Sequence, residues 1–380
     1  MPLFLTIFLA LYAAMNSYLF WKVHQAFPNL GRWHWVLAAV LLLLVASPIL
    51  VRLVDRAEHP RLADAMGGTA YGWLAVLFWF CCVAGALDLW NLAAWGLSHP
   101  FRQAAVAMIP PRVTLVLSGL LVAGAAAWGL HEAKDIQLSA FTIRTPRLAP
   151  GSKPIRIVQM SDMHLGGGVG NGRLAKALKI IEEARPDLIV STGDMVDSPA
   201  HNLLDYSQML AKLSPPLGKW AIPGNHEYYV GIEEARKFHE VAGFHFLRGT
   251  AEQLPGGLWI ACADDPSGRY DVKPPSDPLP VPGADANRSF VLLLKHRPLV
   301  QDDSPGRFDL QLSGHTHGGQ IFPFSLIIAM VYKFDRGLYE LAGGSKLYVS
   351  RGTGTWGPPM RLGSPPEVTL ITIEPAGGGR

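Results

Sequence analysis

Cysteine is scarce in this sequence. The 380 residues include three cysteines, Cys81, Cys82 and Cys262, and these form no CxxC motif and no disulfide framework. Cys81 and Cys82 lie inside an apolar run, where small membrane-buried side chains are the simplest interpretation. The cysteines therefore give no sign of a thiolate metal site, and they do not settle in which compartment the chain resides.

Charge is also scarce, because Asp, Glu, Lys and Arg together make up only 17% of the residues, with a net charge of +3. No stripe of Lys and Arg appears, so no nucleic-acid surface is evident. The scarcity is uneven: residues 1–135 hold eight of the 33 basic and six of the 30 acidic residues, which leaves 25 and 24 for the rest. The second part therefore has the charge balance of an ordinary soluble domain.

Four charge-poor runs in the first part are long enough to cross a bilayer, which takes about 20 apolar residues. They cover residues 3–21, 35–54, 71–95 and 113–131. Trp and Tyr lie near the ends of several runs, as in an interfacial belt. A soluble apolar helical domain is the alternative, but the short polar loops between the runs favour transmembrane helices. The first run lacks a basic flank and a cleavage site, so we interpret it as an anchor.

The third run contains Asp88 near its end. A carboxylate inside a membrane span is often functional, while an interfacial or inter-helix position is the plainer alternative. The sequence leaves both interpretations of Asp88 open.

Four spans would place both termini on the same side of the membrane. Near the membrane, that side would carry six basic residues and the other side four: Arg52, Arg56, Arg61, Lys134, Arg144 and Arg147, against Lys22, Arg32, Arg102 and Arg112. The positive-inside rule therefore favours a cytoplasmic C-terminal domain.

The rest of the chain divides into three predicted parts: a linker over 136–153, a catalytic domain over 154–375 and a tail over 376–380. The linker is predicted because Pro and Gly in "TPRLAPGSKP" break any regular pattern. The domain begins with an apolar strand at 155–164, a helical pattern at 171–186 and a second strand at 187–194, which is typical of an α/β fold. Later runs at 346–350 and 368–373 come with few helices and indicate added antiparallel pairing.

Five apolar strands in this domain each end in residues that bind metals. Because ligands bind beyond the carboxyl ends of the strands in open α/β sheets, these side chains are expected to converge. The set is Asp162, His164, Asp194, Asn225, His226, His296, His315 and His317. A single such residue is usually a turn former or a helix cap, but eight together are poorly explained in that way.

The donor types point to a metal centre of a particular kind. Carboxylate, carboxamide and imidazole groups without thiolate suit Mn, Fe, Zn or Mg. The set is too large for one tetrahedral ion, so two ions bridged by a carboxylate fit the count better. Such pairs activate water and neutralise the oxygens of a phosphoryl group in transfer.

The blocks "DMH" (162–164), "GD" (193–194), "GNHE" (224–227), "KH" (295–296) and "GHTH" (314–317) resemble the calcineurin-like binuclear metallophosphoesterases in order and spacing. The resemblance covers roughly residues 154–374, and "GHTHGGQ" is similar to a bacterial branch that is often membrane-attached. It implies a two-sheet sandwich flanked by helices, here preceded by an all-α region of about four transmembrane helices. It also implies a bacterial inner membrane location.

The resemblance further implies two divalent metal ions, with manganese favoured among Mn, Fe, Zn and Mg. One ion would bind Asp162, His164, Asp194 and His317. The other would bind Asp194, Asn225, His296 and His315, with Asp194 bridging. His226 would be catalytic and would protonate or stabilise the leaving oxygen, while a metal-bridging hydroxide attacks phosphorus.

The substrate is then expected to be a phosphodiester or pyrophosphate. Membrane anchoring favours a lipid-linked substrate, and the apolar stretch "IFPFSLIIAMVY" (321–332) is either a lipid-facing lip or a core segment. Arg297, Arg351 and Arg361 are either phosphate ligands or structural arginines. The alternatives are a phosphodiesterase for soluble nucleotides and a catalytically silent membrane scaffold or sensor that binds phosphorylated partners. Apart from the substrate and the lipid bilayer, the sequence identifies no partner.

Overall fold

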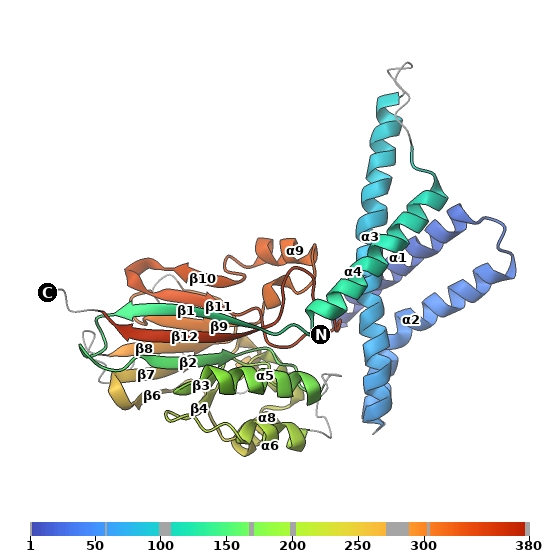
Figure 1. Ribbon diagram of the computed structural model, residues 1–380. Coiled ribbons are helices and arrows are strands. Elements are labelled where there is room, and N and C mark those ends of the chain that lie inside the picture. The colour runs from blue at the N-terminus through green and yellow to red at the C-terminus, as the bar shows by residue number, and fades with distance from the viewer. Residues whose placement is uncertain are drawn as a thin grey trace. The chain divides into compact units, whose positions relative to one another are not determined.

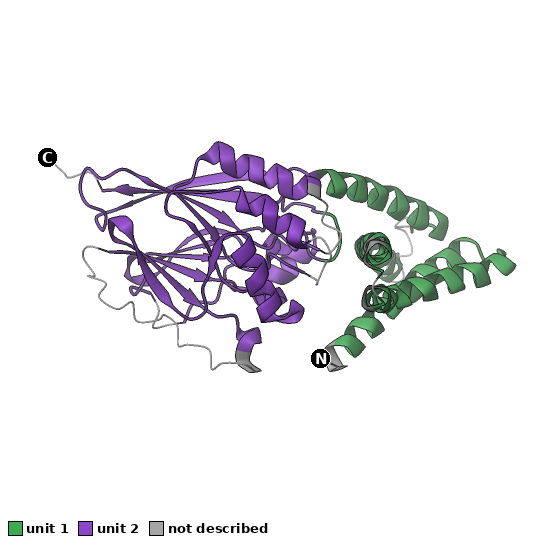
Figure 2. Ribbon diagram, turned by 90° about the horizontal axis from the view of Figure 1, so that it is seen from below, with its two compact units in different colours: residues 1–131, 357–360 green, residues 132–356, 361–380 purple. Residues whose placement is uncertain are grey.

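The computed structural model describes residues 2–57, 59–98, 108–166, 171–197, 203–270, 289–301 and 305–376. By internal contacts the chain divides into two units (Figure 2). Unit 1 consists of residues 1–131 and 357–360, and unit 2 consists of residues 132–356 and 361–380. Residues 377–380 of the predicted tail lie outside the described residues.

Unit 1 consists of long apolar helices: α1 (Pro2–Ala26), α2 (Arg32–Arg56), α3 (Pro60–Ser98) and α4 (Pro111–Glu132). Within the described part of the chain, three helical segments are long and apolar enough to cross a membrane: Arg32–Val54, Ala65–Leu97 and Pro111–Glu132. The sequence predicts four. The helix α1 is present at the first predicted span but is not among these three segments.

The polar side chains of α1 pair with α3. Lys22 forms an ion pair with Asp88, and the Tyr18 hydroxyl donates to the same carboxylate at 2.6 Å. Farther along the two helices, Trp73 Nε1 donates to Asn16 Oδ1 at 3.2 Å. Polar pairs of this kind hold helices together where water is absent. Asp88 therefore has an inter-helix role, the plainer of the two interpretations of this residue.

Unit 2 is a two-sheet sandwich with helices, which confirms the predicted α/β fold (Figure 1). The first sheet has the order β1-β12-β2-β3-β4-β5 and the second β10-β11-β9-β8-β7-β6. The strands of the first sheet are β1 (Gln137–Thr145), β12 (Glu367–Pro375), β2 (Ile155–Met160), β3 (Leu188–Ser191), β4 (Lys219–Ala221) and β5 (Phe244–Phe246). Those of the second are β10 (Gly337–Glu340), β11 (Lys346–Val349), β9 (Leu310–Ser313), β8 (Phe290–Lys295), β7 (Leu258–Ala263) and β6 (Ala251–Leu254).

The two sheets bring parallel strands to the same end of the sandwich. In the first sheet β2, β3, β4 and β5 are parallel, and in the second sheet β7, β8, β9 and β11 are parallel. Antiparallel pairing occurs where β12 meets β2, and at the pairs β6–β7 and β10–β11. The parallel strands are predominantly apolar because both of their faces are covered.

The helices of unit 2 are α5 (Asn171–Ala184), α6 (Leu203–Ala211), α7 (Asn225–Val230), α8 (Ile232–Val241) and α9 (Phe324–Val331). Short 3-10 turns occur at Pro255–Gly257, Pro266–Tyr270, His317–Gly319 and Ala342–Gly344. Residues of α5, α6 and α8 pack with Val158 and Ile189 of the first sheet in one apolar cluster. A second cluster, which includes Ile157, Val190 and Leu292, fills the space between the sheets.

Part of the predicted linker is a strand. Residues 137–145 form β1 and pair in parallel with β12 over Gln137↔Glu367 to Thr145↔Pro375. The prediction of an irregular linker is wrong for these residues, because the Pro and Gly residues that guided it follow the strand. Within β1, Ile143 is 5% exposed and faces the core between the sheets, while Leu138 is 46% exposed.

We therefore expect Ile143→Ala to lower the free energy of unfolding of the catalytic unit by about 2–5 kcal/mol, the usual range for truncating a buried isoleucine. Leu138→Ala in the same strand should change it by less than about 0.5 kcal/mol. Urea unfolding of the full chain in detergent, followed by tryptophan fluorescence, measures both. Equal effects of the two variants would contradict the assignment of β1.

Candidate metal centre

All eight side chains predicted from the sequence meet at the carboxyl ends of the parallel strands. The chain turns away from the sheet directly after each strand, so these residues project from the same edge. Asp162 and His164 follow β2, Asp194 follows β3, Asn225 and His226 begin α7 after β4, His296 follows β8, and His315 and His317 follow β9. The structure brings every member of the predicted set together.

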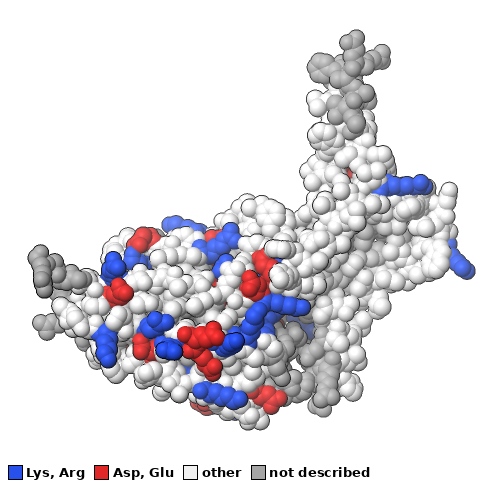
Figure 3. Space-filling model, viewed as in Figure 1, with Lys and Arg blue, Asp and Glu red and all other residues white. Residues whose placement is uncertain are grey.

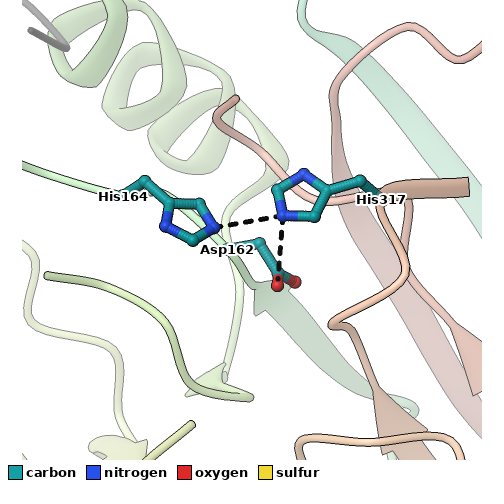
Figure 4. Close-up of side chains that lie close together, drawn as sticks. All are labelled: Asp162, His164 and His317. Carbon is teal, nitrogen blue, oxygen red and sulfur yellow. Dashed lines mark hydrogen bonds and ion pairs between the residues drawn. The ribbon is translucent and has the colours of Figure 1, made fainter. Parts of the chain in front are cut away.

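One group of ligand atoms belongs to Asp162, His164 and His317 (Figure 4). His164 Nε2 lies 3.1 Å from His317 Nε2, and His317 Nε2 lies 3.6 Å from Asp162 Oδ1. All three side chains are buried. Their donor atoms point toward one another, as they would around a shared cation.

A second group belongs to Asp194, His296 and His315. Asp194 Oδ2 lies 3.1 Å from His296 Nε2, and His315 Nδ1 also lies 3.1 Å from that nitrogen. Asn225 Oδ1 approaches the same nitrogen at 3.2 Å. His296 Nδ1 donates to the carbonyl of Thr192 at 2.8 Å, which leaves Nε2 as the nitrogen with a free lone pair.

Asp194 lies between these groups. Its carboxylate belongs to the second group and also to a third, with His164 and His226. It is 2% exposed, and its Oδ1 accepts the backbone N–H of His226 at 2.8 Å. The neighbouring backbone must come very close, since a β-carbon at Gly224 would lie 2.2 Å from Asp194 Oδ1. Only glycine fits there.

The electrostatics favour cation binding. Burial alone raises the pKa of Asp194, but the positive charge of nearby imidazoles, His296 above all, holds it well below its usual range. Burial and then repulsion from His296 and Arg297 lower the pKa of His315 to about 3. Burial followed by the charge of Arg361 also lowers the pKa of His317 well below its usual value. Asp194, His315 and His317 are thus in the forms that bind metals, an ionised carboxylate and neutral imidazoles. Burial by itself lowers the pKa of His296, but the charge of Asp194 raises it to about 10, so this imidazole must release its proton when a cation binds.

The donor set therefore fits divalent cations. It offers two carboxylates, imidazole nitrogens and a carboxamide, with no thiolate, as hard and borderline ions prefer. The atoms of each group lie within 4.8 Å of one another.

Asp197 is a functional candidate that the sequence analysis missed. Its carboxylate forms an ion pair with His226 Nδ1, and its Oδ1 lies 3.4 Å from His164 Nδ1. The other ring nitrogen of His164, Nε2, faces the predicted metal site. The signal available in the sequence was its position three residues after Asp194 in "GDMVD".

Glu227 is a second missed residue. It is fully buried, and its carboxylate accepts the backbone N–H groups of Gly224, Asp194 and Met195 at 2.7, 2.9 and 2.8 Å. It thereby joins the loop after β3 to the loop after β4. Its place next to His226 in "GNHE" was the only sign of this role.

Two of the three arginines proposed as phosphate ligands make structural contacts with acidic side chains. Arg297 Nε donates to Asp265 Oδ2 at 2.8 Å, and Arg351 Nε donates to Glu367 Oε2 at 2.9 Å. Arg361 is fully buried and donates to backbone carbonyls of the surrounding loop, including that of Arg351 at 2.7 Å. These contacts favour the structural interpretation of all three.

Comparison with known proteins agrees with this geometry. Residues 155–319 match the family model described as calcineurin-like phosphoesterase. An uncharacterised metallophosphoesterase of Aquifex aeolicus is 43% identical over 253 residues, which are 66% of this chain and 97% of that protein. A bovine (Bos taurus) transmembrane protein with a metallophosphoesterase domain is 28% identical over 369 residues, which are 90% of this chain and 81% of that protein.

Among solved structures, the NAD nucleotidase of Haemophilus influenzae has a TM-score of 0.35 at 16% sequence identity and covers 53% of this chain and 45% of that one. That likeness is too small to bear on function.

The fold and the donor set thus define a metal-dependent phosphoester hydrolase. The chain belongs to the calcineurin-like metallophosphoesterase family. The apolar helices of unit 1, together with the transmembrane relatives, indicate a membrane protein.

Asp197→Asn should lower kcat by about 10–100-fold, because a hydrogen-bonded carboxylate behind functional imidazoles fixes their orientation and tautomer. Turnover of bis(p-nitrophenyl) phosphate by the full chain in detergent measures the effect. Asp205→Asn, at an exposed carboxylate on α6, is the matched control and should leave kcat unchanged. An unchanged kcat in Asp197→Asn would remove this residue from the site.

Proposed function

We propose that this chain is a membrane-anchored hydrolase that cleaves a phosphodiester or pyrophosphate bond, with two divalent cations and a lipid-linked substrate. The observation that carries the proposal is the place of Asp194, whose carboxylate is shared by two groups of converging ligand atoms. A carboxylate in that position is able to bridge two ions. When bound, two divalent cations would activate a water molecule as nucleophile and neutralise the charge on the phosphoryl oxygens.

In this proposal each ion has its own set of ligands, and Asp194 belongs to both sets. Asp162, His164, Asp194 and His317 hold one ion. Asp194, Asn225, His296 and His315 hold the other. Oxygen and imidazole donors without thiolate suit Mn, Fe, Zn and Mg, and among these we favour manganese on the family resemblance.

His226 supplies the proton for the leaving oxygen. Burial by itself lowers the pKa of His226, but its hydrogen bond to Asp197 and the charges of Asp194 and Asp197 raise it to about 9. The imidazole is then protonated near neutral pH, as a general acid must be. Asp197 acts as a positioning residue, because it binds Nδ1 and leaves Nε2 to face the substrate.

The lipid-linked part of the proposal rests on the membrane helices and on the apolar segment beside the site. Water-soluble nucleotides are the competing substrate class. The ratio of kcat/KM for CDP-diacylglycerol in vesicles to that for CDP-glycerol discriminates between them. A ratio well above one supports a lipid substrate, and a ratio at or below one favours the soluble class.

We also propose that the catalytic unit faces the cytoplasm of a bacterial inner membrane. The charge asymmetry that supports this does not depend on whether α1 spans the bilayer, because Lys22 and Arg32 lie on the same side in either case. Green fluorescent protein fused to the C-terminus should fluoresce, and a dark, exported fusion would contradict this orientation.

We expect His226→Ala to lower turnover of bis(p-nitrophenyl) phosphate by about 100-fold or more, the usual contribution of a general acid. The full chain is stripped of metal in detergent, resupplied with manganese and assayed. His245→Ala, which removes an exposed imidazole stacked on Trp220, is the matched control and should retain turnover. Metal-independent turnover, or full activity of His226→Ala, would contradict the proposal. No turnover with any divalent ion would leave the silent scaffold as the better account.

A further inference from the structure

The helix α9 exposes an apolar surface. Its sequence, FSLIIAMV, contains no charge, and none of its residues is buried. Leu326, Met330 and Val331 are 57%, 78% and 68% exposed. Residues 324–331 are therefore not a core segment, although one of the two sequence interpretations of 321–332 placed them there, and only Ile321 ahead of the helix is buried. A continuous apolar surface of this kind on a folded unit marks a contact with a membrane or another molecule.

This helix is fixed to the candidate metal centre at both ends. At its start, Gly319 packs so closely against it that a β-carbon on Gly319 would lie 2.2 Å from Ser325 Cα. At its end, the Tyr332 hydroxyl lies 2.9 Å from His315 Nε2. The apolar surface is thus directly beside two of the candidate ligands, His315 and His317.

Exposed aromatic side chains also lie around His226. The ring of Tyr229 lies 5.2 Å from that of His226, and the ring of Trp356 lies 6.4 Å from it. Tyr229 is 63% exposed and Trp356 is 51% exposed. Tyr and Trp are the residues that prefer the boundary between lipid and water.

The charges near α9 suit an anionic lipid surface. No acidic residue occurs between positions 321 and 334, and the exposed Lys333 and Arg336 follow the helix, with Asp335 between them and 3.8 Å from the Arg336 guanidinium. Figure 3 shows uncoloured side chains over α9, with both basic and acidic side chains around them. Cationic side chains beside an apolar surface are typical of segments that bind at a bilayer interface.

The chain itself supplies the bilayer. Four residues separate the end of α4 at Glu132 from the start of β1 at Gln137. Extended residues span at most about 3.6 Å each, so this connection tethers the catalytic unit to a helix long enough to cross a membrane.

We propose that α9, together with Tyr229 and Trp356 near His226, lies in the interface of the bilayer that holds the chain's own apolar helices. The candidate metal centre then opens onto the lipid head groups, where phosphoesters of membrane lipids are found. This inference rests on the proposed function for the identity of the substrate, but the docking of α9 is tested separately.

The test places a fluorophore on α9. Met330→Cys in a Cys81→Ser/Cys82→Ser background is labelled with an environment-sensitive dye, while the remaining Cys262 is buried. The full chain is reconstituted in phosphatidylcholine–phosphatidylglycerol vesicles with or without acyl-brominated lipid. The emission should shift to shorter wavelength, and the brominated lipid should quench it.

Val241→Cys provides the matched control, because Val241 is 49% exposed at the end of α8, on the part of unit 2 away from α9 (Figure 1). Both labels are on the same tethered unit, so quenching caused by the tether alone would affect both of them. If α9 docks on the bilayer, the label at position 241 should be quenched much less than the label at position 330. Equal quenching of the two labels, or no quenching at Met330→Cys, would overturn the docking of α9.

Activity provides a second readout. Leu326→Ser/Met330→Ser should lower turnover of CDP-diacylglycerol in vesicles by about tenfold, because two apolar side chains no longer enter the lipid. Both residues are exposed, so turnover of bis(p-nitrophenyl) phosphate in detergent should not change. A quenched label without turnover of the lipid would support docking and count against the proposed lipid substrate. Turnover of the lipid with an unquenched label would support the proposed lipid substrate and contradict the docking of α9.

Discussion

The candidate site depends on a backbone conformation that most residues avoid. Five of its eight side chains come from residues with left-handed φ angles: Asp162 at 53°, His164 at 52°, Asp194 at 54°, His315 at 71° and His317 at 51°. This conformation costs about 1–2 kcal/mol for each residue that is not glycine. The total is on the order of 5–10 kcal/mol, which is comparable to the whole net stability of a domain. Strain of this size persists only where surrounding contacts enforce it.

Buried carboxylates and short backbone contacts provide that enforcement. Glu227 accepts three backbone N–H groups from the loops after β3 and β4, and Asp162 accepts the backbone N–H of His315 at 2.9 Å. The loops are also linked directly, since the His164 N–H donates to the carbonyl of Asp194 at 3.0 Å. The two sheets supply the rigid strand ends from which these loops depart. These contacts therefore fix the loops that carry the site.

The sequence predicts the site better than its surroundings. Ligand-type residues at the ends of apolar strands can be recognised individually, and the topology of parallel strands requires them to meet. Asp197 and Glu227 escape such reasoning, because a lone carboxylate in a loop looks like a turn residue until its partners are known. The strand β1 escapes it as well, since its parallel partner β12 lies more than two hundred residues farther along the chain. The exposure of α9 depends on tertiary packing, because the same apolar run would suit a core.

The central claim is that Asp194 joins two cation sites into one centre, and the most direct test counts the ions. Elemental analysis of the purified full chain, loaded with manganese and freed of excess metal, should find two ions per chain. In Asp194→Asn the content should fall for both positions, because each loses a charged ligand. Two ions in the wild type and the loss of both in the variant are the predicted result. One ion per chain, or an unchanged content in Asp194→Asn, would contradict the account.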